Sequence, residues 1–299
     1  MSHRHAHQGD AGGATIAGTS DVAAVADTIR QWLADADRIL IGAGAGLSAA
    51  AGYDYSDTRR FAELFPALHR LGLRARYQLI GAPLPPELLW GYWATHVADI
   101  RFSPGPHPVY QHLRALVGDT DHFVMTSNVD ALFARNGFDP DRVFTPQGDY
   151  GRLQCETPCT RDTWPSEPII DTALAAYDPA TGQVTDPAAI PACPNCGGPV
   201  FLNVHKGPEY LIDPYLPTGR RLQQWIDDGP DDEQLLVLDI GSGYNTPSVI
   251  RWPMQRLAAA RPQGRLVRIN LEHPDVPQQL TGRAIGIAAG ADDVLQSLI

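Results

Sequence analysis

The sequence predicts an α/β fold in which a parallel, Rossmann-like sheet carries a small inserted module. Several short apolar segments each end in Gly, Asn, Asp or Ser. This pattern is typical of parallel strands whose carboxyl ends meet a ligand. Between residues 151 and 230 the chain is instead rich in Pro, Asp and Cys, with weak periodicity. The main domain is therefore predicted to come from both ends of the chain.

The predicted elements follow from hydrophobic periodicity. Apolar residues at helical spacing predict a helix over 21–36, and the run Arg38 to Gly42 predicts a strand that leads into glycines. Further strands are expected at 122–126, 234–239, 264–270 and 283–288, and a final helix at 291–298. Trp90, Tyr92 and Trp93 indicate a packed helix face.

The domain boundaries follow from these elements and from the change in composition. Residues 19–150 and 231–299 are predicted to form the Rossmann-like domain, and 151–230 the inserted module. Residues 1–18 are polar, rich in Gly and Ala, and carry three histidines. We expect a disordered tail there, with a metal-binding tract as the alternative. This stretch lacks the apolar segment of a secretory signal, so a cytoplasmic location is expected.

Charge and hydropathy restrict the partners. The formal net charge is −11, which argues against a nucleic-acid backbone or an anionic membrane as the main partner. No apolar run has the length of a membrane span. A soluble anion such as a dinucleotide remains compatible, because helix N-termini and local arginines act at short range.

The four cysteines predict a structural metal site. Cys155 and Cys159 form one pair, and Cys193 and Cys196 form a second pair within Cys-Pro-Asn-Cys-Gly-Gly. Each pair can supply two sulfurs to a tetrahedral zinc ion, and four thiolates leave no open coordination position. Two disulfides or four unrelated thiols are the alternatives, which a reducing compartment and the spacing disfavour.

The segment Gly42-Ala-Gly-Ala-Gly-Leu-Ser48 follows the first strand of the predicted main domain. A glycine turn between a strand and small residues favours a phosphate at a helix N-terminus. The loop has G-x-G without the full dinucleotide-binding spacing, so a tight turn without a ligand is the alternative.

The order of the motifs resembles that of the sirtuin family. G-A-G-x-S at Gly44 to Ser48 is followed by Thr126-Ser-Asn-Val-Asp130, two cysteine pairs, Gly241-Ser-Gly243 and Ile269-Asn270. The resemblance spans roughly residues 29–299. It implies a Rossmann-like domain with a zinc module, and NAD as a substrate that is consumed.

One departure from the family pattern concerns the chemistry. Gln147, in Thr145-Pro-Gln-Gly148, stands where the resemblance places a catalytic histidine. Histidine suits a base because its pKa lies near neutrality, whereas an amide cannot take up a proton at physiological pH. With Gly52-Tyr-Asp-Tyr55 and the segment around Asn245, this departure resembles the class M, or macrodomain-linked, sirtuins of microbes. That branch is associated with ADP-ribosylation of a lipoyl-carrier protein related to the glycine-cleavage H protein.

The resemblance implies a set of site residues. Asn128, Asp130 and Gln147 are the expected catalytic residues, with a helix cap as the alternative for Asn128 and Asp130. Tyr53 and Tyr55 could gate water. The expected NAD contacts are Gly42, Ala43, Gly44, Ser48, Gly52, Tyr53, Asn128, Asp130, Gln147, Gly241, Ser242, Asn245, Asn270 and Ala291.

The sequence therefore predicts NAD-dependent transfer of ADP-ribose to a protein acceptor. The expected partners are a lipoyl-carrier protein and an associated macrodomain hydrolase. A lysine deacylase with an unusual base, an NAD hydrolase and a non-catalytic NAD or ADP-ribose sensor are the alternatives. The deacylase is disfavoured by Gln147 on chemical grounds.

Overall fold

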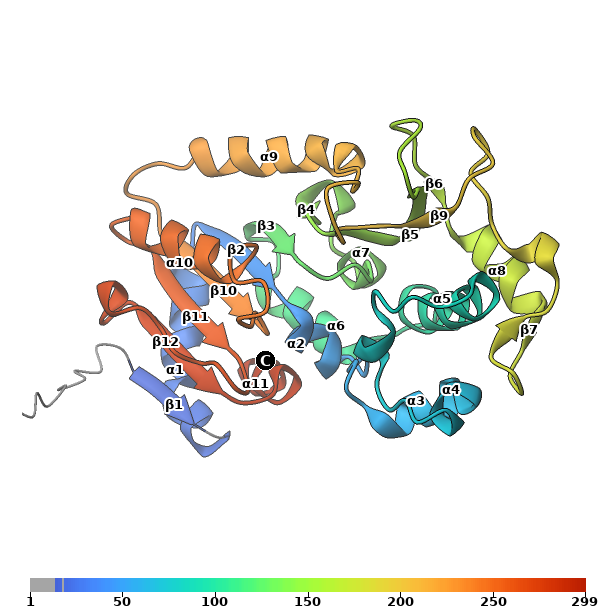
Figure 1. Cartoon of the computed structure of the whole chain (residues 1–299). Coiled ribbons are helices and arrows are strands. Elements are labelled where there is room, and N and C mark those ends of the chain that lie inside the picture. Colours follow the sequence, from blue (N-terminus) through green and yellow to red (C-terminus); the bar gives the residue numbers. More distant parts are fainter. Residues whose placement is uncertain (1–13, 18) are drawn as a thin grey trace, which may run out of the picture.

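The computed structural model describes residues 14–17 and 19–299, and its larger lobe is built on a parallel sheet (Figure 1). The strand order is β1-β12-β11-β10-β2-β3-β4, and every pair is parallel. From β2 the chain continues outward through β3 and β4, and from β10 it continues the other way through β11 and β12. The order therefore reverses between β2 and β10, where open α/β sheets bind their ligands. The strands are β1 Ala14–Ala17, β2 Arg38–Ala43, β3 Asp121–Thr126, β4 Val143–Phe144, β10 Leu235–Ile240, β11 Arg265–Ile269 and β12 Ala284–Ala288.

Helices cover both faces of this sheet, and its central strands are buried along their whole length. Every residue of β2 and β10 is buried, as expected of strands packed on two sides. Ile39 and Ile41 face one core, and Leu40 faces the other. The first core is closed by α1 Thr19–Asp35, α2 Ala45–Ala50, α6 Pro108–Val117, α7 Leu132–Arg135 and α11 Ala291–Leu298, and the second by α9 Leu216–Asp227 and α10 Arg251–Ala260.

A smaller lobe lies beside the sheet, on the right of Figure 1. It contains an antiparallel sheet in the order β6-β5-β9 and a two-stranded sheet of β7 and β8. A separate hydrophobic core holds the lobe together. Its elements are α3 Thr58–Leu64, α4 Pro66–Arg70, α5 Pro86–Arg101, β5 Gly148–Cys155, β6 Trp164–Pro165, α8 Glu167–Ala175, β7 Tyr177–Asp178, β8 Gln183–Val184 and β9 Val200–Val204.

The predicted α/β fold class and the strands and helices of the main sheet are confirmed, with ends that shift by one or two residues. The packed face of Trp90, Tyr92 and Trp93 is confirmed as well, since all three are buried in α5. Within residues 14–17 and 19–299, no helix combines the length and hydropathy needed to cross a membrane.

Two features differ from the predicted division of the chain. Ala14–Ala17, predicted as part of a disordered tail, form β1, which pairs with β12; that prediction is wrong for these four residues. The rest of the predicted tail lies outside the described residues. The core of the small lobe also takes residues from 61–102, before the predicted module, whereas Leu222 of α9 packs on the main sheet. Long-range packing causes this difference, which local patterns do not reveal.

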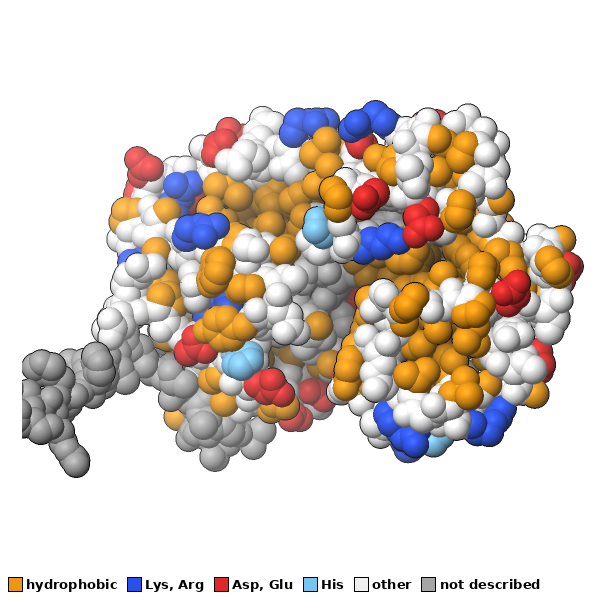
Figure 2. Space-filling view, in the orientation of Figure 1, with side chains coloured by type: hydrophobic (Ala, Val, Ile, Leu, Met, Phe, Trp, Pro, Cys, Tyr) orange, Lys and Arg blue, Asp and Glu red, His pale blue; other side chains and the backbone are white. Residues whose placement is uncertain are grey.

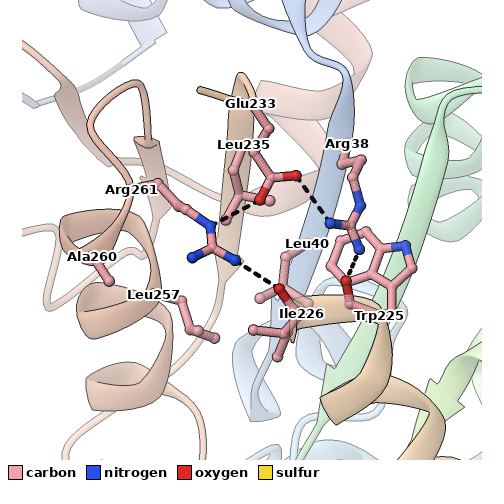
Figure 3. Close-up of a pocket in the computed structure, with 9 residues that line it drawn as sticks. All are labelled: Arg38, Leu40, Trp225, Ile226, Glu233, Leu235, Leu257, Ala260 and Arg261. Carbon is pink, nitrogen blue, oxygen red and sulfur yellow. Dashed lines mark hydrogen bonds and ion pairs between the residues drawn. The ribbon is translucent and has the colours of Figure 1, made fainter. Parts of the chain in front are cut away.

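A buried ion-pair cluster fastens α9 to the sheet (Figure 3). The Glu233 carboxylate accepts hydrogen bonds from Arg38 Nη1 at 3.0 Å and from Arg261 Nε at 2.9 Å, and its side chain is only 2% exposed. Arg38 also lies 3.7 Å from the centroid of the Trp225 ring. The two arginines donate to the carbonyl oxygens of Trp225 and Ile226, near the end of α9. The cavity among these residues is only about 20 Å³, which suits a water molecule and no larger ligand.

Glu233→Ala is expected to lower the free energy of unfolding by about 3 kcal/mol, because two partly buried guanidinium groups lose their shared carboxylate. Urea denaturation measures the change. Asp27→Ala is the matched control, since it removes an exposed carboxylate paired with Arg30 and should cost less than about 1 kcal/mol. Equal losses in the two variants would contradict the structural role of Glu233.

Candidate active site

The loops that follow β2 and β10 pack directly on each other. The backbone N–H of Gly44 donates to Ile240 O at 2.9 Å, and that of Gly46 donates to Gly241 O at 3.1 Å. A Cβ atom on Gly46 would lie 2.7 Å from Gly241 Cα, and Gly241 itself has a φ of +70°. Only glycine satisfies both demands. The loop that was predicted to bind phosphate therefore holds the ends of β2 and β10 together.

A cleft of about 960 Å³ opens where the strand order reverses. Figure 2 shows the hollow between the two lobes, with hydrophobic side chains gathered on the small lobe. Its volume is at the upper end of the range typical of ligand sites. The predicted site residues that line it are Ser48, Tyr53, Asn128, Asp130, Gln147, Gly241, Asn245, Asn270 and Ala291.

The other predicted NAD contacts do not line the cleft; they are Gly42, Ala43, Gly44, Gly52 and Ser242. A Cβ on Gly42 would meet the Met254 side chain at 2.5 Å, so this glycine makes room for α10. Ala43 is fully buried in the core of the sheet. A Cβ on Gly44 would lie 2.6 Å from Gly241 O and 2.8 Å from Ser242 Cα. Gly52 is exposed and has a φ of +94°, and Ser242 is buried.

Asn128 follows β3 and bridges two of the loops. Its side-chain Nδ2 donates to Gly44 O at 3.0 Å, and its backbone N–H donates to Thr126 Oγ1 at 3.0 Å. The same threonine hydroxyl donates to Ala43 O at 3.1 Å. Asn128 therefore reaches the cleft already fixed to the glycine loop, which leaves its amide oxygen for a ligand.

Asp130 is the buried carboxylate of the cleft, at 4% exposure. The Ser48 hydroxyl donates to Oδ2 at 2.5 Å, and the Leu132 N–H donates to Oδ1 at 2.9 Å. Burial raises the pKa of this carboxyl, and the two hydrogen bonds oppose the rise. Leu132 is the first residue of α7, so Asp130 accepts from an N-terminal N–H of this helix, although the N-cap position itself is Ala131. The carboxylate thus both bonds to the start of α7 and lines the cleft.

Gln147 reaches the cleft at the turn before β5. Its backbone carbonyl accepts from the His205 N–H at 2.9 Å, which ties the turn to the end of β9. The side chain is half-buried and lines the cleft. Gln147 and Asp130 therefore face the same space, and one of them offers an uncharged amide where the other offers a carboxylate.

Tyr53 is held by the helix start that contains His107. Asn136 Nδ2 lies 2.8 Å from Leu132 O and 3.1 Å from His107 Nδ1, so His107 accepts at Nδ1 and carries its proton on Nε2. That proton faces the Tyr53 hydroxyl at 2.9 Å. Burial lowers the pKa of His107. This histidine is a positioning group behind the cleft.

The far end of the cleft is organised by residues that sequence patterns did not all reveal. Asn270 Nδ2 donates to Ser242 O at 2.8 Å, and its Oδ1 accepts from the Glu272 and His273 N–H groups. Arg251, fully buried, donates to Ser242 O at 3.2 Å and to His273 O at 3.0 Å. Nothing in the sequence marks Arg251 as a loop anchor. The unpredicted lining includes Tyr77, Tyr150, Thr246, Glu272, His273 and Asp292.

The four cysteines come together at the outer end of the small lobe. Their sulfur atoms all lie within 4.8 Å of one another. The Cys155–Cys196 and Cys159–Cys193 sulfur distances are 3.7 and 3.6 Å. Four sulfurs at about 2.3 Å from a tetrahedral zinc ion are separated by about 3.8 Å. The cluster therefore suits one structural zinc, as predicted, and it joins the end of β5 to the turn before β9.

Comparisons with known proteins place this architecture. No family model matches the chain. A Fusarium oxysporum f. sp. cubense protein described as a probable bifunctional ADP-ribose hydrolase/ADP-ribosyltransferase is 37% identical over 250 residues, covering 81% of this chain and 42% of that protein. The chain thus spans about two fifths of that relative's length. A Staphylococcus aureus protein ADP-ribosyltransferase is 28% identical, over 87% of this chain and 82% of its own length.

Solved structures agree on the fold. A Sir2 homologue mutant in complex with 2′-O-acetyl ADP ribose has a TM-score of 0.60 at 19% identity, covering 91% of this chain and 94% of its own. A Sir2 homolog–NAD complex has a TM-score of 0.59 at 18% identity, covering 91% of both chains. The chain has a Sir2-like fold. At the level of the fold this confirms the resemblance to sirtuins drawn from the motif order, and the Sir2-like fold explains why the cleft lies between a parallel sheet and a cysteine-bearing lobe.

Removing the metal is expected to unfold the small lobe. Purified protein should contain about one equivalent of zinc, and Cys193→Ser should lose it and increase the proteolysis of residues 148–204. Metal analysis and limited proteolysis measure both effects. Protein that stays metal-free with a fully protease-resistant lobe would contradict the zinc site. Adding zinc back to chelator-treated wild type is the control.

Asp130→Asn is expected to raise the free energy of unfolding at neutral pH by about 1 kcal/mol. Because the pKa of Asp130 is higher in the folded state than in the unfolded chain, its ionised form destabilises the fold, and this cost disappears as the pH falls through the raised pKa. Thermal unfolding of both proteins across the acidic range measures the difference. A gain that does not shrink toward acidic pH would contradict the burial argument.

Proposed function

We propose that the chain is an NAD-dependent protein ADP-ribosyltransferase. The observation that carries the proposal is the pairing of Gln147 with Asp130 in one cleft of a Sir2-like fold. The relatives from Fusarium and Staphylococcus, whose descriptions name ADP-ribosyltransferase activity, support it.

The proposed reaction breaks the bond between ribose C1′ and the nicotinamide nitrogen. The electron pair of that bond leaves with nicotinamide, which becomes neutral, and the acceptor nucleophile forms the new bond to C1′. The acceptor's proton is released to a base or to solvent. Positive charge develops on the ribose during the displacement, and the Asp130 carboxylate would stabilise it electrostatically.

Each site residue has a part in this scheme. The amide oxygen of Asn128 and the side chain of Gln147 would orient the ribose hydroxyls by hydrogen bonds. Asp130 would also accept from the nicotinamide carboxamide. The loops of Gly241, Asn245, Asn270 and Ala291 would hold the adenosine half. The contact between Gly46 and Gly241 would place the backbone of this loop beside the pyrophosphate. The hydroxyl of Ser48 would hold the Asp130 carboxylate in place.

Deacylation is the second candidate, because a Pseudomonas aeruginosa relative described as NAD-dependent protein deacylase 2 is 26% identical over 87% of this chain and 93% of its own length. That reaction needs a base to activate a ribose hydroxyl after the acyl oxygen has attacked C1′. The glutamine amide cannot serve as that base. The arrangement therefore favours transfer to an acceptor.

The partners are proposals of the same kind. Membership in the macrodomain-linked class would make a lipoyl-carrier protein the acceptor and a macrodomain hydrolase the enzyme that reverses the modification. The hydrolase named in the description of the Fusarium relative supports that pairing. A cytoplasmic location would keep the cysteines reduced and give access to NAD.

Incubation with labelled NAD tests the transfer. Wild type should label a lipoyl-carrier acceptor and release nicotinamide in equal amounts, whereas Asp130→Asn should label it at least about 100-fold more slowly. Asp27→Ala, at an exposed position of α1 outside the cleft lining, is the control and should match wild type. Efficient removal of acyl groups from lysine peptides without acceptor labelling would favour the deacylase. Free ADP-ribose formed equally without any acceptor would indicate a hydrolase.

A further inference from the structure

Two tyrosines of the small lobe line the cleft beside Asp130. Tyr55 and Tyr150 both face it, and Asp130 lies close enough to act electrostatically on both phenols. The backbone N–H of Tyr150 donates to Val129 O at 2.9 Å, between Asn128 and Asp130. Tyr150 is therefore fixed to the loop that carries the proposed catalytic residues.

The hydroxyl groups continue into the lobe as a chain of hydrogen bonds. Tyr55 Oη and Tyr150 Oη are 3.3 Å apart, and Tyr150 Oη lies 3.3 Å from His96 Nε2. His96 Nδ1 lies 3.3 Å from the Tyr92 hydroxyl, which donates to Arg76 O at 3.1 Å. His96 and Tyr92 are fully buried. These hydrogen bonds thus lead from the cleft to α5 in the core of the small lobe.

The direction of every bond follows from the number of protons. Tyr92 has one hydroxyl proton and donates it to the Arg76 carbonyl, so it accepts from His96 Nδ1–H. His96 Nε2 is then an acceptor, and Tyr150 must donate to it. The Tyr150 oxygen therefore accepts from Tyr55. The Tyr55 oxygen, at the start of the chain, keeps its lone pairs for the cleft.

The series of hydrogen bonds from Tyr55 to Tyr92 does not store a proton. Burial and the nearby Arg76 charge hold the pKa of His96 well below its usual range, so the imidazole stays neutral. A proton that entered from the cleft would have no stable site along the chain. This series of hydrogen bonds consequently orients the Tyr55 hydroxyl, and it presents Tyr55 as a hydrogen-bond acceptor beside the Asp130 carboxylate.

We propose that Tyr55, oriented by Tyr150 and His96, accepts a hydrogen bond from the carboxamide N–H of the nicotinamide group. This inference rests on the proposed NAD site. A carboxamide has two N–H donors, one for Asp130 and one for Tyr55. The corresponding acid, in nicotinic acid adenine dinucleotide, presents only acceptors to these two groups. The tyrosine pair thus contributes to selecting the amide over the acid, and Tyr150 is a positioning residue.

Binding measured by calorimetry tests the inference without turnover. Tyr55→Phe should weaken NAD binding about 5- to 10-fold and leave ADP-ribose binding unchanged, because ADP-ribose lacks the nicotinamide. Tyr150→Phe should weaken NAD binding less, by about 2- to 5-fold, since it removes only the orienting partner. Both changes should narrow the preference for NAD over nicotinic acid adenine dinucleotide.

Tyr177→Phe, in β7 outside the cleft lining, is the matched control and should bind all three ligands like wild type. Circular dichroism and thermal unfolding show whether each variant is folded. The inference is overturned if Tyr55→Phe weakens NAD and ADP-ribose binding equally, or weakens neither. If the binding differences appear but no acceptor is labelled, the transfer proposal fails alone. If labelling succeeds while Tyr55→Phe binds NAD normally, this inference fails alone.

Discussion

The contact between the β2 and β10 loops is the constraint on which the rest of the site depends. Gly46 and Gly241 approach so closely that no side chain fits between them. The contact brings together loops almost 200 residues apart in the sequence, at the point where the strand order reverses. Asn128 then bonds to Gly44 O, and Asn270 and Arg251 bond to Ser242 O. The loops at both ends of the cleft are thus anchored to this one contact.

Burial of the Asp130 carboxylate has opposite effects on the proposed chemistry and on the stability of the fold. A carboxylate that stabilises developing positive charge acts most strongly where water is excluded, and exclusion of water is what destabilises it in the resting protein. Ser48 and the Leu132 N–H compensate in part by donating to its two oxygens. The buried Asp130 charge is therefore preorganised at a cost in the stability of the fold, which is a common arrangement in enzymes.

Much of the fold was predictable because its determinants are local. Runs such as Leu235 to Ile240 are mostly apolar and are followed by glycine, and the Cys193–Cys196 knuckle has the spacing of a zinc ligand pair. Asn128, Asp130 and Gln147 were singled out by the motif order that resembles the sirtuins, and all three line the cleft. The anchoring by Arg251 and the chain through Tyr150 and His96 were not predictable, because their partners lie far away in sequence. Gly42 shows the reverse case, where a motif position serves packing against Met254.

The shared core of the small lobe has a consequence for how such a protein can change. Phe61 and Trp93 pack with Leu153 and Leu202, although the stretches that carry them are separated by β3 and the loop of Asp130. The lobe is therefore not a cassette that could be cut out at two points and exchanged for another. During synthesis on the ribosome its first half must wait, apolar and incomplete, until the second half has emerged. Recombination that preserves the lobe must also carry the loop of Asp130 with it.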